Sequence, residues 1–292
     1  MMIAIYVLAL LLFGSTWVAV KFGLQSTEPF TAAVLRFVIA FAVLGAVFRT
    51  WRYRLPSLPK LRRSLLISGF LMYGLNFFFI YLGQQWISAS LAAILFATMP
   101  FFTALFAHYL LPDEKLTWRV IVGMVVGFGG TIALFSQDLA LGGPVYGMAS
   151  MLLASAFCSW ASVLIKRDLG AVDPIQLSIL MILPGLALLV PSMLLLEWPL
   201  KLEIERAGWL SLLYLALMGT GVAFILWYYL LKRISVVALS LMTFLEPLVA
   251  ITLGYLLLNE RLTSHFLIGG ILILAGVLLA TLQPRQSEEP SL

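Results

Sequence analysis

The sequence predicts an all-α polytopic membrane protein whose ten transmembrane helices form two inverted five-helix repeats. Three observations lead to this prediction. Of the 292 residues, 62% are hydrophobic and 11% are charged, which is more apolar side chain than a soluble core of this length can hide from water. The charges are grouped between long uncharged runs, and the second half of the sequence resembles the first.

The uncharged runs define the expected helices, because each is about as long as the roughly 20 residues that cross a bilayer. The first run follows no basic segment and precedes no small-residue cleavage site, so we interpret it as a retained helix and not as a signal peptide. The run from Ser64 to Pro112 is too long for one crossing and turns near Gln84, Gln85 and Trp86. The expected spans are 3–21, 30–48, 64–84, 88–111, 118–136, 145–165, 175–196, 207–231, 235–258 and 264–282.

Basic residues predict the orientation, because cytoplasmic loops are enriched in Lys and Arg. With a cytoplasmic N-terminus, the inner side carries residues 49, 52, 54, 60, 62, 63, 115, 119, 166, 167, 232, 233 and 285, and the outer side carries only residues 21, 201, 206 and 261. We therefore expect both termini in the cytoplasm. The net charge of +5 is explained by orientation and by contact with anionic lipids, so nucleic acid is not an expected partner.

A shift of 145 to 147 residues aligns the two halves. It pairs Lys21 with Lys166, Pro29 with Pro174, Tyr81 with Tyr228, Ser88 with Ser235 and Pro100 with Pro247. The predicted units are residues 1–140 and 141–282, followed by a polar, disordered cytoplasmic tail over 283–292. Because five is odd, the second unit enters the membrane from the opposite side, and such inverted repeats typically alternate around a midplane site. The architecture favours transport.

The same motifs resemble the drug/metabolite transporter superfamily, in its EamA-type branch of bacterial ten-span exporters. The resemblance covers nearly the whole chain and rests on Pro100 and residues 113–116, on Glu246-Pro247 and residues 259–262, and on the helices of Gly123–Gly130 and Gly269–Gly276. It implies a bundle whose cavity is lined by spans three, four, eight and nine, with help from spans one and six. On these spans we add Phe96, Met99 and Thr243 to the candidate substrate site. Members export amino acids and other metabolites, so the resemblance leaves the substrate open.

Glu246 lies about eleven residues into the ninth span, near the bilayer midplane, where an ionised carboxylate costs on the order of 2.5 to 3.5 kcal/mol. Pro247 removes a helix donor beside it, and we expect helix breaks at Pro100 and Pro247. The functional interpretation is a proton or cation site. The structural alternative is a protonated carboxyl group or an ion pair that stabilises the bundle.

Arg36 lies roughly 9 Å below the outer end of the second span. A structural ion pair or snorkelling of the long side chain to the surface is the favoured interpretation. The functional alternative is a donor for a substrate carboxylate or a partner for Glu246.

Aromatic side chains suggest the rest of the cavity. Tyr73, Phe77, Tyr81 and Gln84 follow helical spacing on the third span, with Asn76 one position away. Trp160 in the middle of the sixth span is a cavity candidate, and Trp17 is a candidate gate. Interfacial belts are the structural alternative for such aromatics, and we assign that role to Trp86, Trp118, Trp198, Trp209, Trp227, Tyr228 and Tyr229.

Several other features favour structural roles. Glu114 and Glu260 are explained by helix capping and ion pairing near opposite faces, and the glycines of the fifth and tenth spans by close packing of the two repeats. His108 has no second ligand at metal-binding spacing, so no metal and no cofactor are expected. A monomer or weak dimer is the expected state.

The functional prediction is therefore a secondary transporter, an exporter of small metabolites such as aromatic or other amino acids. Proton exchange at Glu246 is the hypothesis for its coupling. A drug or organic-cation efflux carrier is the alternative, followed by a channel or an intramembrane enzyme. The sequence contains neither the hydrolase and metalloprotease signatures nor a phosphate-binding loop for ATP, which disfavours an enzyme or a primary pump.

Overall fold

The computed structural model describes residues 1–50, 59–87, 89–112, 114, 116–134, 144–200, 203–258 and 264–281. Over these residues it contains helices and their connections but no strand, which confirms the all-α prediction. The helices are α1 (Met2–Gly23), α2 (Pro29–Thr50), α3 (Pro59–Gly69), η1 (Phe70–Leu75), α4 (Asn76–Gln84), α5 (Ala89–Phe96), α6 (Met99–Leu110), α7 (Trp118–Leu134), α8 (Val145–Asp168), α9 (Pro174–Leu196), α10 (Arg206–Tyr214), η3 (Leu215–Val222), α11 (Ala223–Leu231), α12 (Val236–Ser240), α13 (Met242–Leu258) and α14 (Ser264–Thr281).

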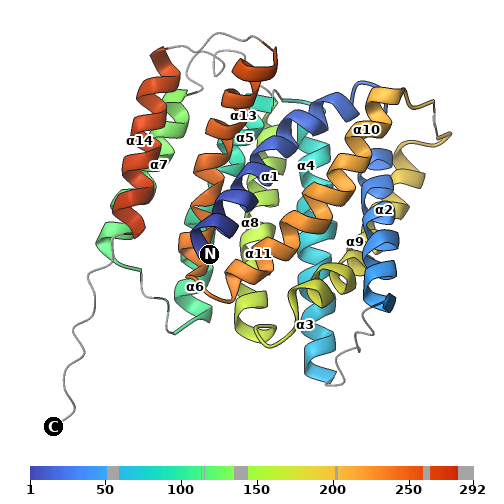
Figure 1. Ribbon diagram of the computed structural model, residues 1–292, viewed down its shortest axis with the longest axis horizontal. Coiled ribbons are helices and arrows are strands. Elements are labelled where there is room, and N and C mark those ends of the chain that lie inside the picture. The colour runs from blue at the N-terminus through green and yellow to red at the C-terminus, as the bar shows by residue number, and fades with distance from the viewer. Residues whose placement is uncertain are drawn as a thin grey trace.

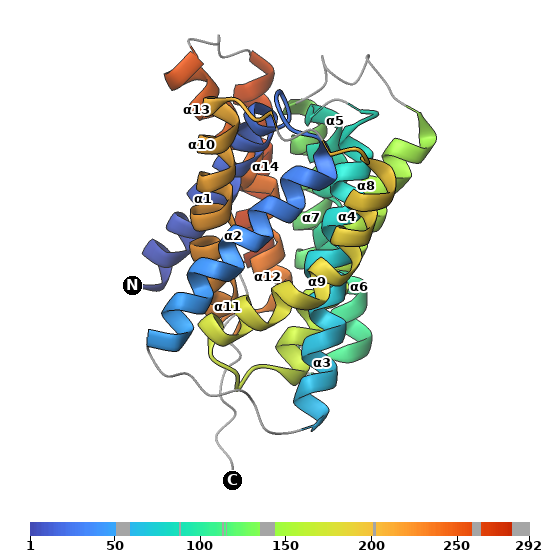
Figure 2. The ribbon, with the colours of Figure 1, turned by 90° about the vertical axis from the view of Figure 1, so that its right-hand side faces the viewer.

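The helices run up and down in one bundle (Figures 1 and 2). We call the end at which α4 finishes the upper end, and the end at which α11 finishes the lower end, as they lie in Figure 1. Eight helical segments are long and apolar enough to cross a membrane, and two shorter apolar helices, Trp118–Leu134 and His265–Thr281, lie where the fifth and tenth spans were expected. The chain is thus a multi-pass membrane protein, and ten full crossings stay a prediction.

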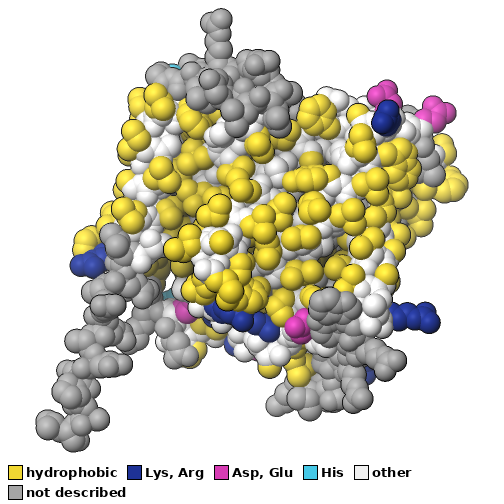
Figure 3. All heavy atoms as spheres, in the orientation of Figure 1, with side chains coloured by type: hydrophobic (Ala, Val, Ile, Leu, Met, Phe, Trp, Pro, Cys, Tyr) yellow, Lys and Arg dark blue, Asp and Glu magenta, His cyan; other side chains and the backbone are white. Residues whose placement is uncertain are grey.

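The surface agrees with immersion in lipid. Hydrophobic side chains cover most of the visible face between the two ends, and most of the Lys and Arg side chains in this view lie near the lower edge (Figure 3). The exposed apolar side chains include Leu11, Ile121 and Leu195, which would be unfavourable against water over so large an area.

The fourth and ninth predicted spans are both interrupted. The fourth divides into α5 and α6 at Ala97 and Thr98, and Pro100 lies in the first turn of α6, where its missing N–H leaves no bond unmade. The ninth divides into α12 and α13 at Leu241.

The expected break at Pro247 is wrong, because Pro247 lies inside α13. The interruption comes six residues earlier. There the backbone N–H of Phe244 bonds to the carbonyl of Leu241 at 3.1 Å, and the hydroxyl of Thr243 donates to the carbonyl of Ser240 at 2.9 Å. These bonds satisfy carbonyls that a regular helix would pair with backbone donors.

Two segments are wound as π-helices. Phe70–Leu75 continues into α4, and Leu215–Val222 continues into α11. Their first residues are separated by 145 positions, within the shift that aligns the two halves of the sequence. Single π turns inside α-helices occur frequently at functional sites.

Helices α7 and α14 form a closely packed pair at the left of Figure 1. A Cβ atom on Gly123 would lie 2.6 Å from the carbonyl oxygen of Gly276 and from the backbone nitrogen of Ala280. A Cβ on Gly130 would lie 2.8 Å from the carbonyl oxygen of Gly269. The glycines therefore allow the two backbones to touch, as expected for packing between the two halves.

Candidate functional site

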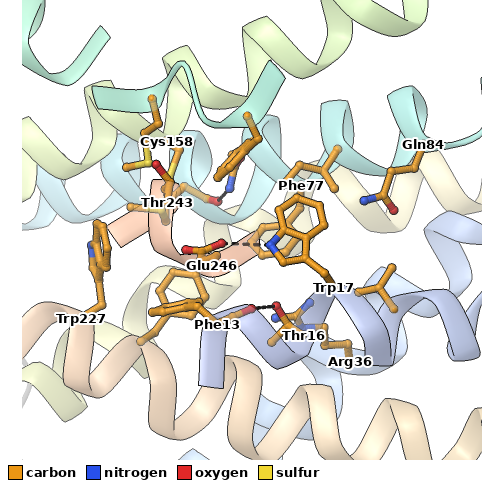
Figure 4. Close-up of a pocket in the computed structure, with 17 residues that line it drawn as sticks. Phe13, Thr16, Trp17, Arg36, Phe77, Gln84, Cys158, Trp227, Thr243 and Glu246 are labelled. Carbon is orange, nitrogen blue, oxygen red and sulfur yellow. Dashed lines mark hydrogen bonds between the residues drawn. The ribbon is translucent and has the colours of Figure 1, made fainter. Parts of the chain in front are cut away.

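A cavity lies inside the bundle, and the space within it and at its open mouth amounts to about 710 Å³. Figure 4 shows its lining side chains as sticks. They come from α1, α2, η1, α4, α5, α6, α8, α11 and α13, and they are Phe13, Thr16, Trp17, Val20, Arg36, Met72, Asn76, Phe77, Ile80, Gln84, Phe96, Met99, Cys158, Phe224, Trp227, Thr243 and Glu246.

Glu246 brings a carboxylate into this mainly apolar cavity. Its side chain is only 7% exposed, and its Oε2 accepts a hydrogen bond from the indole Nε1 of Trp17 at 3.0 Å (Figure 4). The titratable side chains of Tyr6 on α1 and Cys158 on α8 lie within electrostatic range of this carboxylate. The carboxylate thus has one hydrogen-bond donor and no basic partner among the described residues.

Arg36 brings the opposite charge from α2. It is 4% exposed, and its Nε donates to the hydroxyl of Thr220 in η3 at 2.7 Å. The guanidinium also interacts with the hydroxyl of Tyr81 and lies 5.0 Å from the ring centre of Phe77. The favoured expectation of an ion pair or snorkelling does not describe this position, because the partners are neutral and the side chain turns inward. α2 packs against η3 and α9 on this side, which holds Arg36 in the interior.

Two predicted aromatic residues lie behind the cavity wall. Tyr73 is fully buried and packs against Phe37, Phe77 and Phe224. Tyr81 reaches Arg36 and is 2% exposed. Neither residue lines the cavity in this structure.

Trp160 is placed elsewhere, which corrects the expectation that it lines the cavity. It is 41% exposed and packs against Phe106, with the ring centres 6.0 Å apart. The opposite face of α8 carries Cys158, which does line the cavity. The mid-span position of Trp160 did not indicate which side of α8 faces the cavity.

The other predicted substrate residues, Trp17, Asn76, Phe77, Phe96, Met99, Thr243 and Glu246, all line the cavity. Sequence reasoning missed several others and assigned two wrongly. Trp227 lines the cavity, and Tyr228 is buried behind it, although both were expected in an interfacial belt.

The repeat itself was the signal that could have found them. At a shift of 147 residues, Phe77 pairs with Phe224, Ile80 with Trp227, Phe96 with Thr243 and Met99 with Glu246, and all eight line the cavity. Equivalent positions of the two halves thus face one space. The inverted five-helix relation stays a prediction, which these pairs support.

The cavity extends toward the upper end. Its lining includes Gln84, the last residue of α4, and Val20, near the end of α1. Toward the lower end it stops at Met72 and Trp227. Next to these residues in the sequence, the hydroxyl of Tyr228 donates to that of Tyr73 at 3.1 Å.

Further bonds join helices at the lower end. Lys166 Nζ donates to the carbonyls of Leu231 and Ile234, each at 2.7 Å. Lys232 donates to the carbonyl of Val172, and burial lowers the pKa of its ammonium group. These bonds tie α8 and the connection before α9 to the end of α11.

Glu114 acts as a cap on another helix of the lower end. Its carboxylate accepts bonds from the hydroxyl of Ser235 at 2.7 Å and from the backbone N–H of Val236 at 2.9 Å, at the start of α12. The expected capping role thus falls on a distant segment, and Glu114 also acts electrostatically on Lys166. The side chain of Lys21 and residues 88, 113, 115, 259–263 and 283–292 lie outside the described part, and so do the predictions made for them.

Within the described residues, no group of three His, Cys, Asp or Glu side chains is placed to hold a metal ion. The lining of the cavity presents aromatic faces and a few hydrogen-bonding groups to a solute, together with the carboxyl group of Glu246 and the guanidinium of Arg36. A bundle that crosses the membrane several times around a central cavity has the architecture of a membrane transporter.

Comparison with known proteins names the family. The model of the EamA-like transporter family matches residues 1–136 and again residues 145–282. The chain belongs to this family of membrane transporters, within the drug/metabolite transporter superfamily. Such a protein acts on a small-molecule substrate in a lipid bilayer.

Relatives extend over nearly the whole chain. The uncharacterized transporter YoaV of Bacillus subtilis is 28% identical over 93% of both chains. The uncharacterized inner membrane transporter YedA of Escherichia coli K12 is 30% identical over 92% of this chain and 87% of its own. A probable amino-acid metabolite efflux pump of the same strain is 28% identical over 92% and 91%. A solved crystal structure at 23% identity covers 96% of both chains with a TM-score of 0.79, which shows a shared fold.

Proposed function

We propose that this protein exports small metabolites such as aromatic or other amino acids by alternating access around the central cavity. The observation that carries the proposal is a cavity whose lining reaches the end of α4 at the upper end, while the Tyr73–Tyr228 and Lys166 bonds lie toward the lower end. We interpret these bonds as the closed side of the carrier. One state of an alternating carrier requires a central site that opens toward one end only. The Escherichia coli relative named as a probable amino-acid metabolite efflux pump supports the choice of substrate.

The setting we propose is the bacterial inner membrane, with both termini in the cytoplasm and the protein as a monomer or weak dimer. In that orientation the lower end is cytoplasmic, and the structure corresponds to an outward-facing form. The relative described as an inner membrane transporter supports the location.

Coupling to protons is assigned to Glu246. A charged carboxylate in an apolar, membrane-embedded cavity is costly unless it is paired or neutralised. We propose that Glu246 takes up a proton when the substrate leaves and loses it when the substrate binds. The negative charge of its carboxylate is then compensated in both steps, by the proton or by the substrate. Trp17 holds the carboxylate in place throughout.

Counterflow in proteoliposomes tests both proposals. A carrier preloaded with unlabelled substrate accumulates labelled substrate transiently, whereas a channel or an enzyme does not. We expect Glu246→Gln to abolish the dependence of the rate on pH, and Glu28→Gln, at an exposed site outside the cavity, to retain it. An unchanged rate and pH profile in Glu246→Gln would exclude proton coupling through this residue.

A drug or organic-cation carrier is the second candidate function. The aromatic lining with Glu246 favours it, because aromatic faces and a carboxylate both attract cations. Arg36 argues against a cation carrier, because its buried positive charge repels a cation. Counterflow of an organic amine compared with an amino acid separates the two functions.

A further inference from the structure

The cavity contains two opposite charges that do not neutralise each other. Across the described ranges the one ion pair within 4.0 Å joins Arg167 to Asp168. Arg36 and Glu246 line the same cavity, yet they form no such pair. Each makes its own contact with a neutral group, Arg36 with Thr220 and Glu246 with Trp17.

Such an arrangement is costly when the cavity is empty. A buried charge is usually paired, because removal from water costs several kcal/mol per ion even after relaxation. Arg36 is nearly inaccessible, and its contacts with Thr220, Tyr81 and Phe77 are to a hydroxyl, a hydroxyl and a ring. These contacts orient the guanidinium but supply no negative charge.

The guanidinium retains donors for a further partner. An arginine has five N–H donors in a planar fork that matches a carboxylate, and the bond to Thr220 uses the one on Nε. The contact with the Tyr81 hydroxyl engages a further donor, so the remaining N–H groups on the terminal nitrogens of Arg36 are left for a carboxylate. Figure 4 shows Arg36 and Glu246 among the side chains around the cavity, on helices α2 and α13.

We propose that Arg36 is the residue that recognises the substrate carboxylate, while Glu246 binds the substrate ammonium group. The ligand class is then a zwitterionic α-amino acid, with its side chain among Phe77, Phe96 and Phe224. This inference rests on the proposed transport function and deepens it. A cation without a carboxylate leaves Arg36 uncompensated, and a carboxylic acid without an amine leaves Glu246 uncompensated.

Three probes of similar shape test the two contacts: L-phenylalanine, 2-phenylethylamine and 3-phenylpropionate. We would measure their Kd values for the purified full-length protein in detergent by calorimetry. L-Phenylalanine is expected to bind at least about tenfold more tightly than either analogue, because each analogue lacks one charged group and leaves a buried charge of the cavity without its hydrogen-bonded partner. Failure of all three probes to bind the wild-type protein would overturn the inference.

Variants assign each contact. Arg36→Gln is expected to raise the Kd of L-phenylalanine to that of 2-phenylethylamine, and to leave the Kd of 2-phenylethylamine unchanged. Glu246→Gln is expected to raise the Kd of L-phenylalanine to that of 3-phenylpropionate. Trp160→Phe, outside the cavity, serves as the matched control with unchanged values. If Arg36→Gln weakens L-phenylalanine and 2-phenylethylamine equally, Arg36 is not the carboxylate site.

A second variant covers the case in which Arg36→Gln does not fold. Thr220→Val keeps the charge and removes the anchor on Nε, so it is expected to weaken L-phenylalanine but not 2-phenylethylamine. Equal binding of L-phenylalanine to Thr220→Val and wild type would contradict the inference. Counterflow of 2-phenylethylamine without a preference for L-phenylalanine would overturn this inference alone, whereas the absence of saturable counterflow for any tested metabolite would overturn the transport proposal itself.

Discussion

The indole Nε1 of Trp17 on α1 donates a hydrogen bond to Oε2 of Glu246 on α13, at 3.0 Å. Helices α1 and α13 pack against each other, so this bond joins the first helix of the chain to the ninth predicted span across one wall of the cavity. It is the contact that orients the carboxylate in the structure. Its removal should therefore affect transport more than folding.

Replacing Trp17 by Phe keeps an aromatic ring but removes this donor. We expect transport at low substrate concentration to fall roughly tenfold, since hydrogen bonds to charged groups are worth about 1.5 to 3 kcal/mol. Initial rates of counterflow provide the measurement. Trp160→Phe makes the same chemical change on the outside of the bundle and should transport at the wild-type rate, so equal losses in both variants would contradict the assignment.

Cys158 offers a test of which end is open. It is the one cysteine of the sequence, and it lines the cavity with its thiol directed at the sulfur of Met72, 3.7 Å away. A small charged methanethiosulfonate should react faster from the upper end, which we propose is extracytoplasmic, than from the lower end. Right-side-out and inverted vesicles separate the two rates, and Cys158→Ser provides the background.

The bonds at the lower end should control that difference. Lys166→Met removes two bonds to the carbonyls of Leu231 and Ile234. We expect it to accelerate labelling of Cys158 from the lower side. If labelling from that side stays as slow as in the wild type, these bonds do not hold the cavity closed.

The glycines of α7 allow a paired stability test within one helix. Gly123→Ala would place a methyl group 2.6 Å from backbone atoms of α14, whereas a Cβ on Gly129 meets nothing within 4 Å. Overpacking commonly costs about 1 to 3 kcal/mol, and glycine to alanine in an open helical position gains roughly 0.5 to 1 kcal/mol. The melting temperature should fall for Gly123→Ala and stay equal or rise for Gly129→Ala. The same direction for both variants would refute close packing at Gly123.

Glu197 caps the start of α2 from the end of α9. Its two oxygens accept bonds from the backbone N–H groups of Phe30 and Thr31 at 2.6 and 2.7 Å, and a further bond from the Thr31 hydroxyl. Glu197→Gln should lower stability by about 1 to 2 kcal/mol, since helix N-termini attract negative charge. Thermal unfolding in detergent measures the loss. Glu203→Gln, at an exposed position in the following connection, should melt like the wild type.

Much of the fold could be predicted from the sequence, because hydrophobic length and charge grouping are properties of single segments. The long apolar runs at residues 30–48 and 175–196 correspond to α2 and α9 to within two residues at every boundary. The break in the ninth span could not be placed in this way. It depends on bonds from Phe244 and Thr243 to nearby carbonyls, and Pro247 alone did not locate them.

The site was predictable where depth and residue type were enough. Glu246 was predicted because it is a carboxylate in the middle of a span, and Phe77 because it belongs to an aromatic stripe on its helix. Both line the cavity. Trp160 and Trp227 show the limit, because the side of a helix that faces the cavity depends on its neighbours. Arg36 was given a structural role because its partners, Thr220 and Tyr81, come from other helices.

The two π-helical segments at Phe70–Leu75 and Leu215–Val222 lead directly into the cavity-lining parts of α4 and α11. A π turn has the register of an α-helix with one residue inserted, and one residue corresponds to about 100° of helical rotation. Deleting a single residue from either segment would therefore rotate Asn76 and Phe77, or Phe224 and Trp227, out of the cavity wall without shortening the span appreciably. Relatives that lack one such residue would present a different wall to their substrates, so a one-residue gap in an alignment can change specificity as strongly as a substitution in the site.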